Sequence, residues 1–151
     1  MKIVNDVSRP LPYEDGAFDV LVCCEMLEHL PFNTVNLMRE IRRVVAPGGF
    51  AFIAVPNQAS AARRWQLLTG KSTRESIAAW AAAPLSNNWH WREYTEVELR
   101  DLLYTAGFKQ IETGFRHYQI PHHPNPVRRA LVAAMYALAP QLKKDIWAVA
   151  S

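Results

Sequence analysis

An acidic residue and a histidine follow the first long apolar run of the sequence. Glu25 comes directly after the run Phe18–Cys24, and His29 lies four residues further on. One helical turn would place the two side chains on the same face. Because histidine titrates near neutral pH, His29 is a candidate for orienting a substrate or for acting as a general base. The alternative is a histidine at a helix end whose ring is satisfied by the backbone.

Residue types that bind metals are present, but their spacing forms no ligand set. No cysteine or carboxylate accompanies His117, His122 and His123 in a recognisable pattern, so we predict no metal site. The two cysteines of the chain, Cys23 and Cys24, are adjacent. Adjacent side chains on a strand point to opposite faces, so this pair predicts no disulfide and fits a reducing compartment.

Composition excludes several classes of protein. The chain has 151 residues, half of them hydrophobic, and a net charge of +3, which suits one globular domain with its own core. The basic residues stand in short groups typical of solvated helix faces, without the long basic stripe of a nucleic-acid binder. No apolar run reaches the roughly 18 residues that span a bilayer. We therefore expect a cytoplasmic protein with no nucleic-acid partner and no stable membrane insertion.

Two buried strands joined by a helix position Glu25 and His29. The continuous apolar run over 18–24 predicts a strand covered on both faces, as in a parallel sheet. Asn33 or Thr34 can begin a helix over 35–45, in which apolar residues recur at helical spacing. The turn Pro47-Gly48-Gly49 and a second buried strand over 50–55 complete a βαβ crossover.

The remaining elements continue the α/β pattern. Thr95 and Glu98 form a capping box for a helix that ends at Gly107. Strands are predicted over 109–120 and 145–150. We expect a single domain, 1–151, with helical insertions at 58–91 and 117–142.

The insertions contain three predicted helices. The first covers 63–69. The second is rich in alanine, begins at the capping pattern of Ser72 and Glu75, and runs to about Ala83. The third begins at Asn125 and runs to about Leu138.

Three stretches of the sequence carry a resemblance to a known family. They are LPYEDGAFDVLVCCEMLEHL, LMREIRRVVAPGGFAFIAVPN and HWREYTEVELRDLLYTAGFKQIE. In this order they resemble the class I S-adenosylmethionine-dependent methyltransferases, above all the ubiquinone-biosynthesis type and the methyltransferases of sugar or lipid pathways. The resemblance implies a partial Rossmann-like α/β sheet with its last strand antiparallel and helices on both faces. The family's GxGxG loop is absent from this sequence, so we expect an N-terminally truncated domain.

The resemblance also implies a cofactor, S-adenosylmethionine, and residues that bind it. Asp6, with Val7, matches the acidic residue that bonds the adenine amino group in such enzymes. Cys24, Glu25 and Met26 match the segment that lines the cofactor pocket after a central strand. The alternatives are an ordinary loop aspartate that caps a turn and routine packing of Cys24 and Met26.

The acceptor side of the resembling enzymes corresponds to the stretch 90–94. It offers His90, Arg92 and Tyr94 as residues that bind the methyl acceptor, and Arg92 could hold an anionic one. His29 matches a histidine that faces the active-site opening in the family and is the catalytic candidate. The alternative for the aromatic residues is packing of the insertion onto the sheet.

The resemblance predicts methyl transfer to a small-molecule, sugar or lipid-type acceptor. A rival hypothesis is a non-catalytic module that forms a homodimer, or pairs with a complementing chain, through an exposed sheet edge. A third hypothesis is a fragment without an independent function.

Overall fold

The computed structural model describes residues 6–83, 89–117 and 125–151. Its strands are β1 (Phe18–Cys24), β2 (Val45–Pro56), β3 (Ile111–Arg116) and β4 (Asp145–Ala150). Its helices are α1 (Val35–Val44), α2 (Ala61–Leu68), α3 (Ile77–Ala82), α4 (Glu96–Ala106) and α5 (Pro126–Leu138), with the short 3-10 helices η1 (Leu27–His29) and η2 (Pro140–Leu142). The histidines at 122 and 123 lie outside the described residues.

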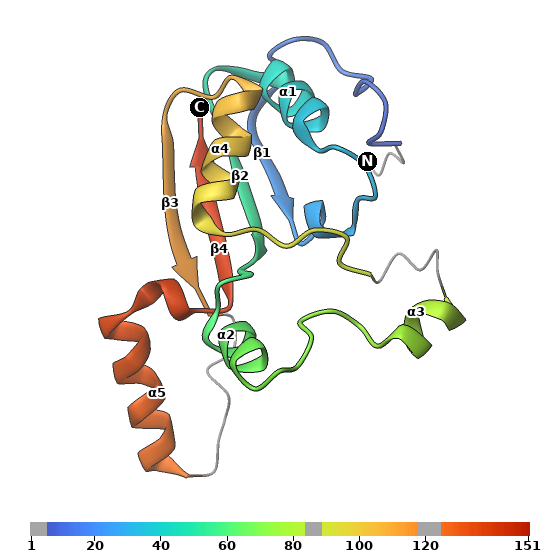
Figure 1. Cartoon of the computed structure of the whole chain (residues 1–151). Helices are drawn as coiled ribbons and strands as arrows, with labels where there is room; N and C mark the ends of the chain where they lie inside the picture. The colour runs from blue at the N-terminus through green and yellow to red at the C-terminus, as the bar shows by residue number, and fades with distance from the viewer. Residues whose placement is uncertain (1–5, 84–88, 118–124) are drawn as a thin grey trace.

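The four strands form one mixed sheet in the order β1-β2-β4-β3 (Figure 1). β1 and β2 are parallel and joined by α1, whereas β4 runs antiparallel to both of its neighbours. This confirms the predicted α/β fold with an antiparallel last strand. The carboxyl ends of β1 and β2 point to the same end of the sheet, toward α2 and α3 (Figure 1).

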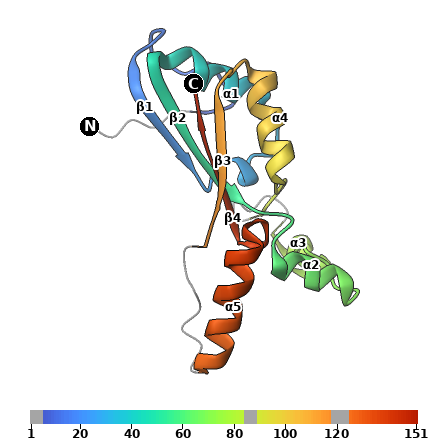
Figure 2. The same ribbon diagram turned by 90° about the vertical axis from the view of Figure 1, so that its left-hand side faces the viewer.

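The hydrophobic core lies between the sheet and two helices on one of its faces. Fully buried residues of α1 and α4, such as Met38 and Leu103, belong to the same core cluster as Ile53 of β2 and Ile146 of β4. Figure 2 shows α1 and α4 on the same side of the sheet. Burial of these apolar side chains provides the main stabilisation of the fold, at roughly 1.5–3 kcal/mol for each large side chain.

The second face of the sheet differs from the prediction. We expected helices on both faces, but the described residues place none against the face opposite α1 and α4 (Figure 2). The exposed fraction is 48% for Val20 and 65% for Val22 on β1, and 38% for Phe50 on β2. The continuous burial predicted for β1 is therefore wrong, because an apolar run alone does not show whether a second layer covers the strand.

The capping box of α4 is confirmed. The Thr95 hydroxyl accepts from the Glu98 N–H, and the Glu98 carboxylate accepts from the Thr95 N–H. Gly107 ends the helix in the left-handed region, at φ +101°, where a side chain would be strained. These short-range signals fix the start and end of the helix that covers β3 and β4.

The predicted starts of β2 and of the alanine-rich helix are wrong. β2 begins at Val45, directly after α1, and contains Pro47-Gly48-Gly49 as an irregularity in its pairing with β1 rather than as a separating turn. An added Cβ at Gly49 would lie 2.5 Å from the Asp19 carbonyl oxygen, so this close approach of the two strands needs glycine. Ser76, rather than Ser72, caps the alanine-rich helix: its hydroxyl accepts from the Ala79 N–H.

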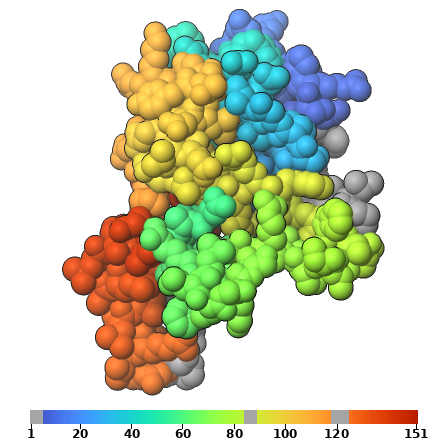
Figure 3. Space-filling model, viewed as in Figure 1, coloured from blue at the N-terminus to red at the C-terminus, as the bar shows by residue number. Residues whose placement is uncertain are grey.

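The helices outside the core lie beyond the end of the sheet. The space-filling view shows α5 projecting from the body of the molecule (Figure 3). The predicted helix over 63–69 is present as α2, with its start moved to Ala61. Among the described residues, no helix combines the length and the apolar character that a bilayer crossing requires.

Candidate functional site

The carboxyl end of β2 is held by one buried amide. Asn57 follows β2 and is 2% exposed. Its side-chain amide donates to the carbonyl oxygens of Gln141 and Lys143, at 2.9 and 2.8 Å, and its amide oxygen accepts from the Ala59 N–H. Asn57 therefore ties the end of β2 to the chain that enters β4, and its role is structural.

The carboxyl end of β1 carries a strained residue. Glu25 has a positive φ of 51°, a conformation that costs a non-glycine residue about 1–2 kcal/mol. Its N–H donates to the Ala54 carbonyl oxygen of β2, which fixes the turn at the strand end. Such strain is typical of functional sites. The helical turn that we expected from Glu25 to His29 is reduced to η1, which begins at Leu27.

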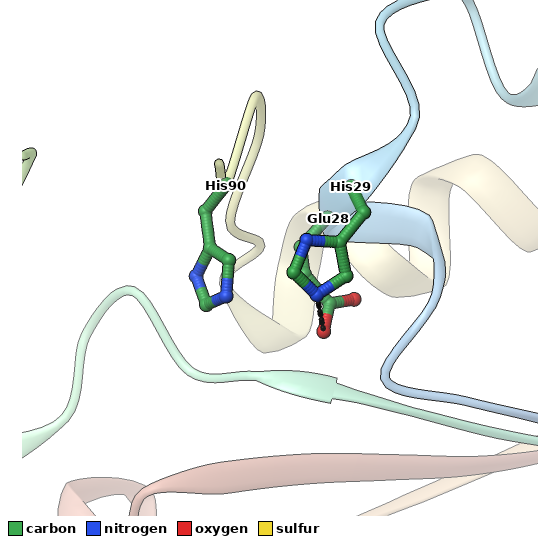
Figure 4. Close-up of side chains that lie close together, drawn as sticks. All are labelled: Glu28, His29 and His90. Atoms are coloured by element: carbon green, nitrogen blue, oxygen red, sulfur yellow. Dashed lines mark ion pairs between the residues drawn. The ribbon is translucent and has the colours of Figure 1, made fainter. Parts of the chain in front are cut away.

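Three side chains meet beside η1. Glu28, His29 and His90 each place one potential ligand atom within 4.8 Å of the other two (Figure 4). The Nε2 atom of His29 lies 3.7 Å from the Glu28 carboxylate, and the rings of His29 and His90 meet edge to face. The segment with His90 is held here because the Trp91 N–H donates to the Glu28 carbonyl oxygen at 2.6 Å.

Glu28 is the most unusual group in this cluster. Its side chain is completely buried, and neither carboxylate oxygen has a hydrogen-bond partner among the described residues. Removal from water raises the pKa of Glu28, and the same effect raises the pKa of the neighbouring Glu25. Two carboxyl groups with raised pKa values at one strand end indicate a functional site.

A chain of charged groups orients His90. Its Nδ1 atom lies 2.9 Å from a carboxylate oxygen of Glu93. The guanidinium of Arg63 on α2 donates to both oxygens of the same carboxylate. Glu93 is nearly buried, so this pair fixes the histidine ring and links α2 to the cluster.

The predicted cofactor residues lie in two segments, and two of them, Val7 and Met26, are partly buried against the hydrophobic core. The Asp6 carboxylate accepts from the N–H and the hydroxyl of Ser8, and this hydrogen bonding lowers its pKa. Asp6 thus caps a local turn, the alternative that the sequence left open. Cys24 and Glu25 are exposed and Met26 is half-buried at the end of β1.

The three predicted acceptor residues do not share one site. His90 joins Glu28 and His29, but Arg92 pairs with Glu98 at 3.0 Å, and its guanidinium lies over the ring of Tyr94. Tyr94 is 3% exposed, and its hydroxyl lies 3.1 Å from that of Thr34. Tyr94 therefore packs the segment against the start of α1, whereas the alternative given above expected packing onto the sheet.

An apolar cavity lies next to His90. Its volume is about 360 Å³, the size of a small-molecule pocket. The side chains that give it an aromatic and aliphatic wall are Ile77, Trp80, Trp89 and Trp91. The sequence had placed Trp91 and Glu93 in the acceptor-side stretch 90–94, with packing as the alternative for the aromatic residues, and it had not singled out Trp80 or Glu28. An aromatic-rich insertion after a buried strand is the signal that could have identified the cavity.

A Rossmann-like sheet with polar groups at the carboxyl ends of its parallel strands defines the class of protein. The family model described as "Methyltransferase domain" matches residues 3–113. The chain belongs to this family, the class I methyltransferases that use S-adenosylmethionine as cofactor. The resemblance read from the sequence is thereby confirmed.

Similar proteins agree with this assignment. The chain is 34% identical over 103 residues to a protein of Mycolicibacterium smegmatis named "Probable S-adenosylmethionine-dependent methyltransferase", a match that covers 68% of this chain and 33% of the relative. A ubiquinone biosynthesis O-methyltransferase of Burkholderia thailandensis is 42% identical over 45 residues, which are 30% of this chain and 19% of the relative. The chain thus spans a third or less of these relatives.

Solved structures share the fold. A SAM-dependent methyltransferase from Thermotoga maritima superposes with a TM-score of 0.60 at 14% identity, over 97% of this chain and 61% of that one. A second, from Archaeoglobus fulgidus, gives a TM-score of 0.59 at 14% identity, over 98% and 66% of the two chains. At this identity the likeness shows the fold alone.

The described residues fit one side of a cofactor site. The exposed Cys24 and Glu25 stand at the carboxyl end of β1, beside the uncovered face that carries Val22. They can form one wall of the site, whereas the described residues supply no opposite wall. Near the same strand end, Glu28, His29 and His90 form a cluster of titratable side chains.

Proposed function

We propose that this chain contributes the acceptor side and one wall of the cofactor site to an S-adenosylmethionine-dependent methyltransferase that acts on a small-molecule, sugar or lipid-type acceptor. The observation that carries the proposal is the aromatic cavity beside His90, at the end of the sheet where α/β enzymes bind their ligands.

The residues of the chain would act mainly by positioning. Bound S-adenosylmethionine supplies an activated methyl group, so alignment of the acceptor provides most of the rate. The faces of Trp80 and Trp91 suit a planar or apolar acceptor. His29 stays a candidate general base: its Nδ1 atom lies 3.2 Å from the Trp89 carbonyl oxygen, which leaves the Nε2 lone pair available for an acceptor proton.

Methyl transfer tests the proposal directly. We expect the purified chain to bind S-adenosylhomocysteine in a calorimetric titration and to move labelled methyl from S-adenosylmethionine to a member of a panel of phenols, sugars and acyl lipids. Trp80→Ala should raise KM for that acceptor about tenfold, as expected for the loss of an aromatic contact of about 1.4 kcal/mol. Trp65→Ala, on the exposed surface of α2, is the control and should change nothing. Absence of binding at millimolar ligand, together with no labelled product, would refute the proposal for this chain.

A second candidate function rests on the exposed side of β1. The strand lies at the edge of the described sheet, and Val20 and Val22 are exposed there. Bare apolar edges recruit partners, so the chain could instead be a non-catalytic module that pairs through β1. Light scattering should then give a dimer mass that Val22→Lys reduces to a monomer. Val97→Lys is the matched control, since Val97 is similarly exposed on α4. A monomer at high concentration would contradict this second function.

A further inference from the structure

A buried carboxylate without a partner needs an explanation. Both oxygens of Glu28 lack a hydrogen bond among the described residues, although the side chain is fully buried. An isolated carboxylate in an apolar environment is strongly disfavoured, and buried charges are normally paired or bound to a metal ion. The nearest basic groups are the imidazoles of His29 and His90. Protonation or a bound cation would each relieve the burial of this carboxylate, and the arrangement of the two imidazoles favours the cation.

Both histidines are held in the tautomer that binds metals. The Nδ1 atom of His29 faces the Trp89 carbonyl oxygen at 3.2 Å, and that of His90 faces the Glu93 carboxylate at 2.9 Å. Both partners are acceptors, so each Nδ1 carries the proton and each Nε2 keeps its lone pair. A second hydrogen bond of this kind, to a carbonyl or carboxylate, accompanies almost every metal-binding histidine.

The geometry points to a divalent metal site: we propose that Glu28, His29 and His90 bind one Zn²⁺ ion or a similar transition-metal ion. Ligand atoms around tetrahedral zinc stand about 3.4 Å apart when each bond is about 2.1 Å long. The three groups already lie within 4.8 Å of one another, so small side-chain rotations close the site. Figure 4 shows the two rings and the carboxylate converging from two separate segments of the chain.

The ligand types select the class of metal. Two imidazoles with one carboxylate favour zinc, cobalt, nickel or iron over calcium and magnesium, which prefer oxygen ligands. Three protein ligands leave a fourth position open, as in catalytic rather than structural zinc sites. His90 also lines the aromatic cavity, so the ion would lie at the cavity wall.

The site would also redefine the role of His29. A metal ion on Nε2 occupies the lone pair that a general base needs, so the two roles exclude each other. Binding of the metal does not depend on the proposed methyl transfer, because it can be measured without cofactor or acceptor. Failure of one proposal therefore leaves the other standing.

Metal titration of the purified chain tests the site. After removal of metals with a chelator, we expect one equivalent of Zn²⁺ per chain by elemental analysis and a visible tetrahedral spectrum with Co²⁺. Glu28→Gln, His29→Gln and His90→Gln should each weaken binding at least a hundredfold. The joint change of His122 and His123 to Gln should leave the affinity for Zn²⁺ unchanged. It is the control for nonspecific metal binding by histidines outside the site.

A positioning residue makes the test specific. Glu93→Gln touches no metal in the proposed site but removes the carboxylate behind His90, and it should weaken binding ten- to a hundredfold. Circular dichroism verifies that each variant is folded. If Glu28→Gln unfolds, His90→Gln serves as the ligand variant instead, because His90 is partly exposed and its replacement should not unfold the chain. No stoichiometric binding of Zn²⁺ or Co²⁺, or binding lost with His122 and His123 but kept without His90, would overturn the proposal.

Discussion

Replacing Asn57 by aspartate changes one atom of a buried hydrogen-bond network from donor to acceptor. The Asn57 amide donates to the carbonyl oxygens of Gln141 and Lys143, at 2.9 and 2.8 Å. In Asn57→Asp a carboxylate oxygen would face both carbonyl oxygens at these distances. The bond from the Ala59 N–H to the other oxygen can remain. The substitution therefore preserves shape and removes only the two donors.

The size of the effect depends on pH. The protonated carboxyl group can donate to one of the two carbonyl oxygens, so the protonated variant loses one hydrogen bond, which costs about 1 kcal/mol. Burial beside two carbonyl oxygens would raise the pKa of the new carboxyl group in the folded state, and a rise of roughly two units adds about 2.7 kcal/mol once the group must ionise. A raised folded-state pKa means that stability is present below the unfolded value of about 3.9 and is lost as pH rises through the folded value. We therefore expect a loss of about 1 kcal/mol at pH 4 and about 4 kcal/mol at pH 8.

Asn57→Ala is the matched control. It removes three side-chain hydrogen bonds but adds no titratable group, so its cost of about 3 kcal/mol should be the same at both pH values. Urea unfolding at pH 4 and pH 8 gives the free energy of unfolding of each variant. The difference between the two variants at each pH cancels the pH dependence of the rest of the protein. The reasoning predicts that the aspartate variant is the more stable at pH 4 and the less stable at pH 8. An order that does not change with pH would refute the assigned donor role of Asn57.

Three further outcomes test the fold around the site. Gly49→Ala should destabilise by about 3 kcal/mol in urea unfolding, because its Cβ would meet a backbone carbonyl oxygen, whereas Gly48→Ala, at φ +85° with open space around it, should cost only about 1 kcal/mol; equal losses would contradict the steric argument. Thr95→Ala removes the capping hydroxyl and should lower stability by about 1 kcal/mol, and Thr95→Ser should restore most of it. Burial raises the pKa of the Cys23 thiol to about 12, so at pH 8 a thiol reagent should label the exposed Cys24 alone until the protein unfolds; rapid labelling of both would disprove the burial of Cys23.

Short-range signals predicted the fold well. The capping box of Thr95 and Glu98 depends on residues three apart, and its geometry is decided within one helical turn. The apolar run over 18–24 became β1 with the predicted bounds. By contrast, the exposure of Val22 depends on which layers cover the strand, which no local pattern records.

The site was only partly predictable, for a physical reason. The sequence pointed to Glu25 because it is a polar residue at the mouth of a buried strand, and an expected helical turn placed His29 on the same face. The positive φ of Glu25 and the short helix η1 instead rotate Glu28 into the interior. Its neighbour His90 comes from a segment far along the chain, held by the backbone bond from Trp91 to Glu28. That contact forms only in the folded protein, so residue spacing could not indicate it.

Two departures from local consistency lie within four residues of each other at the end of β1. Glu25 adopts a backbone conformation that disfavours its side chain, and Glu28 buries a carboxylate that has no hydrogen-bond partner among the described residues. Natural sequences generally keep local and global preferences in agreement, and exceptions concentrate at functional sites. Asn57, at the end of the neighbouring strand, is equally buried and polar, yet all its side-chain hydrogen-bonding atoms have partners. The amide of Asn57 after β2 is fully hydrogen-bonded, whereas, among the described residues, the carboxylate of Glu28 after β1 is not. This contrast points to the end of β1 as the functional end of the sheet, where the proposed metal ion would bind the Glu28 carboxylate.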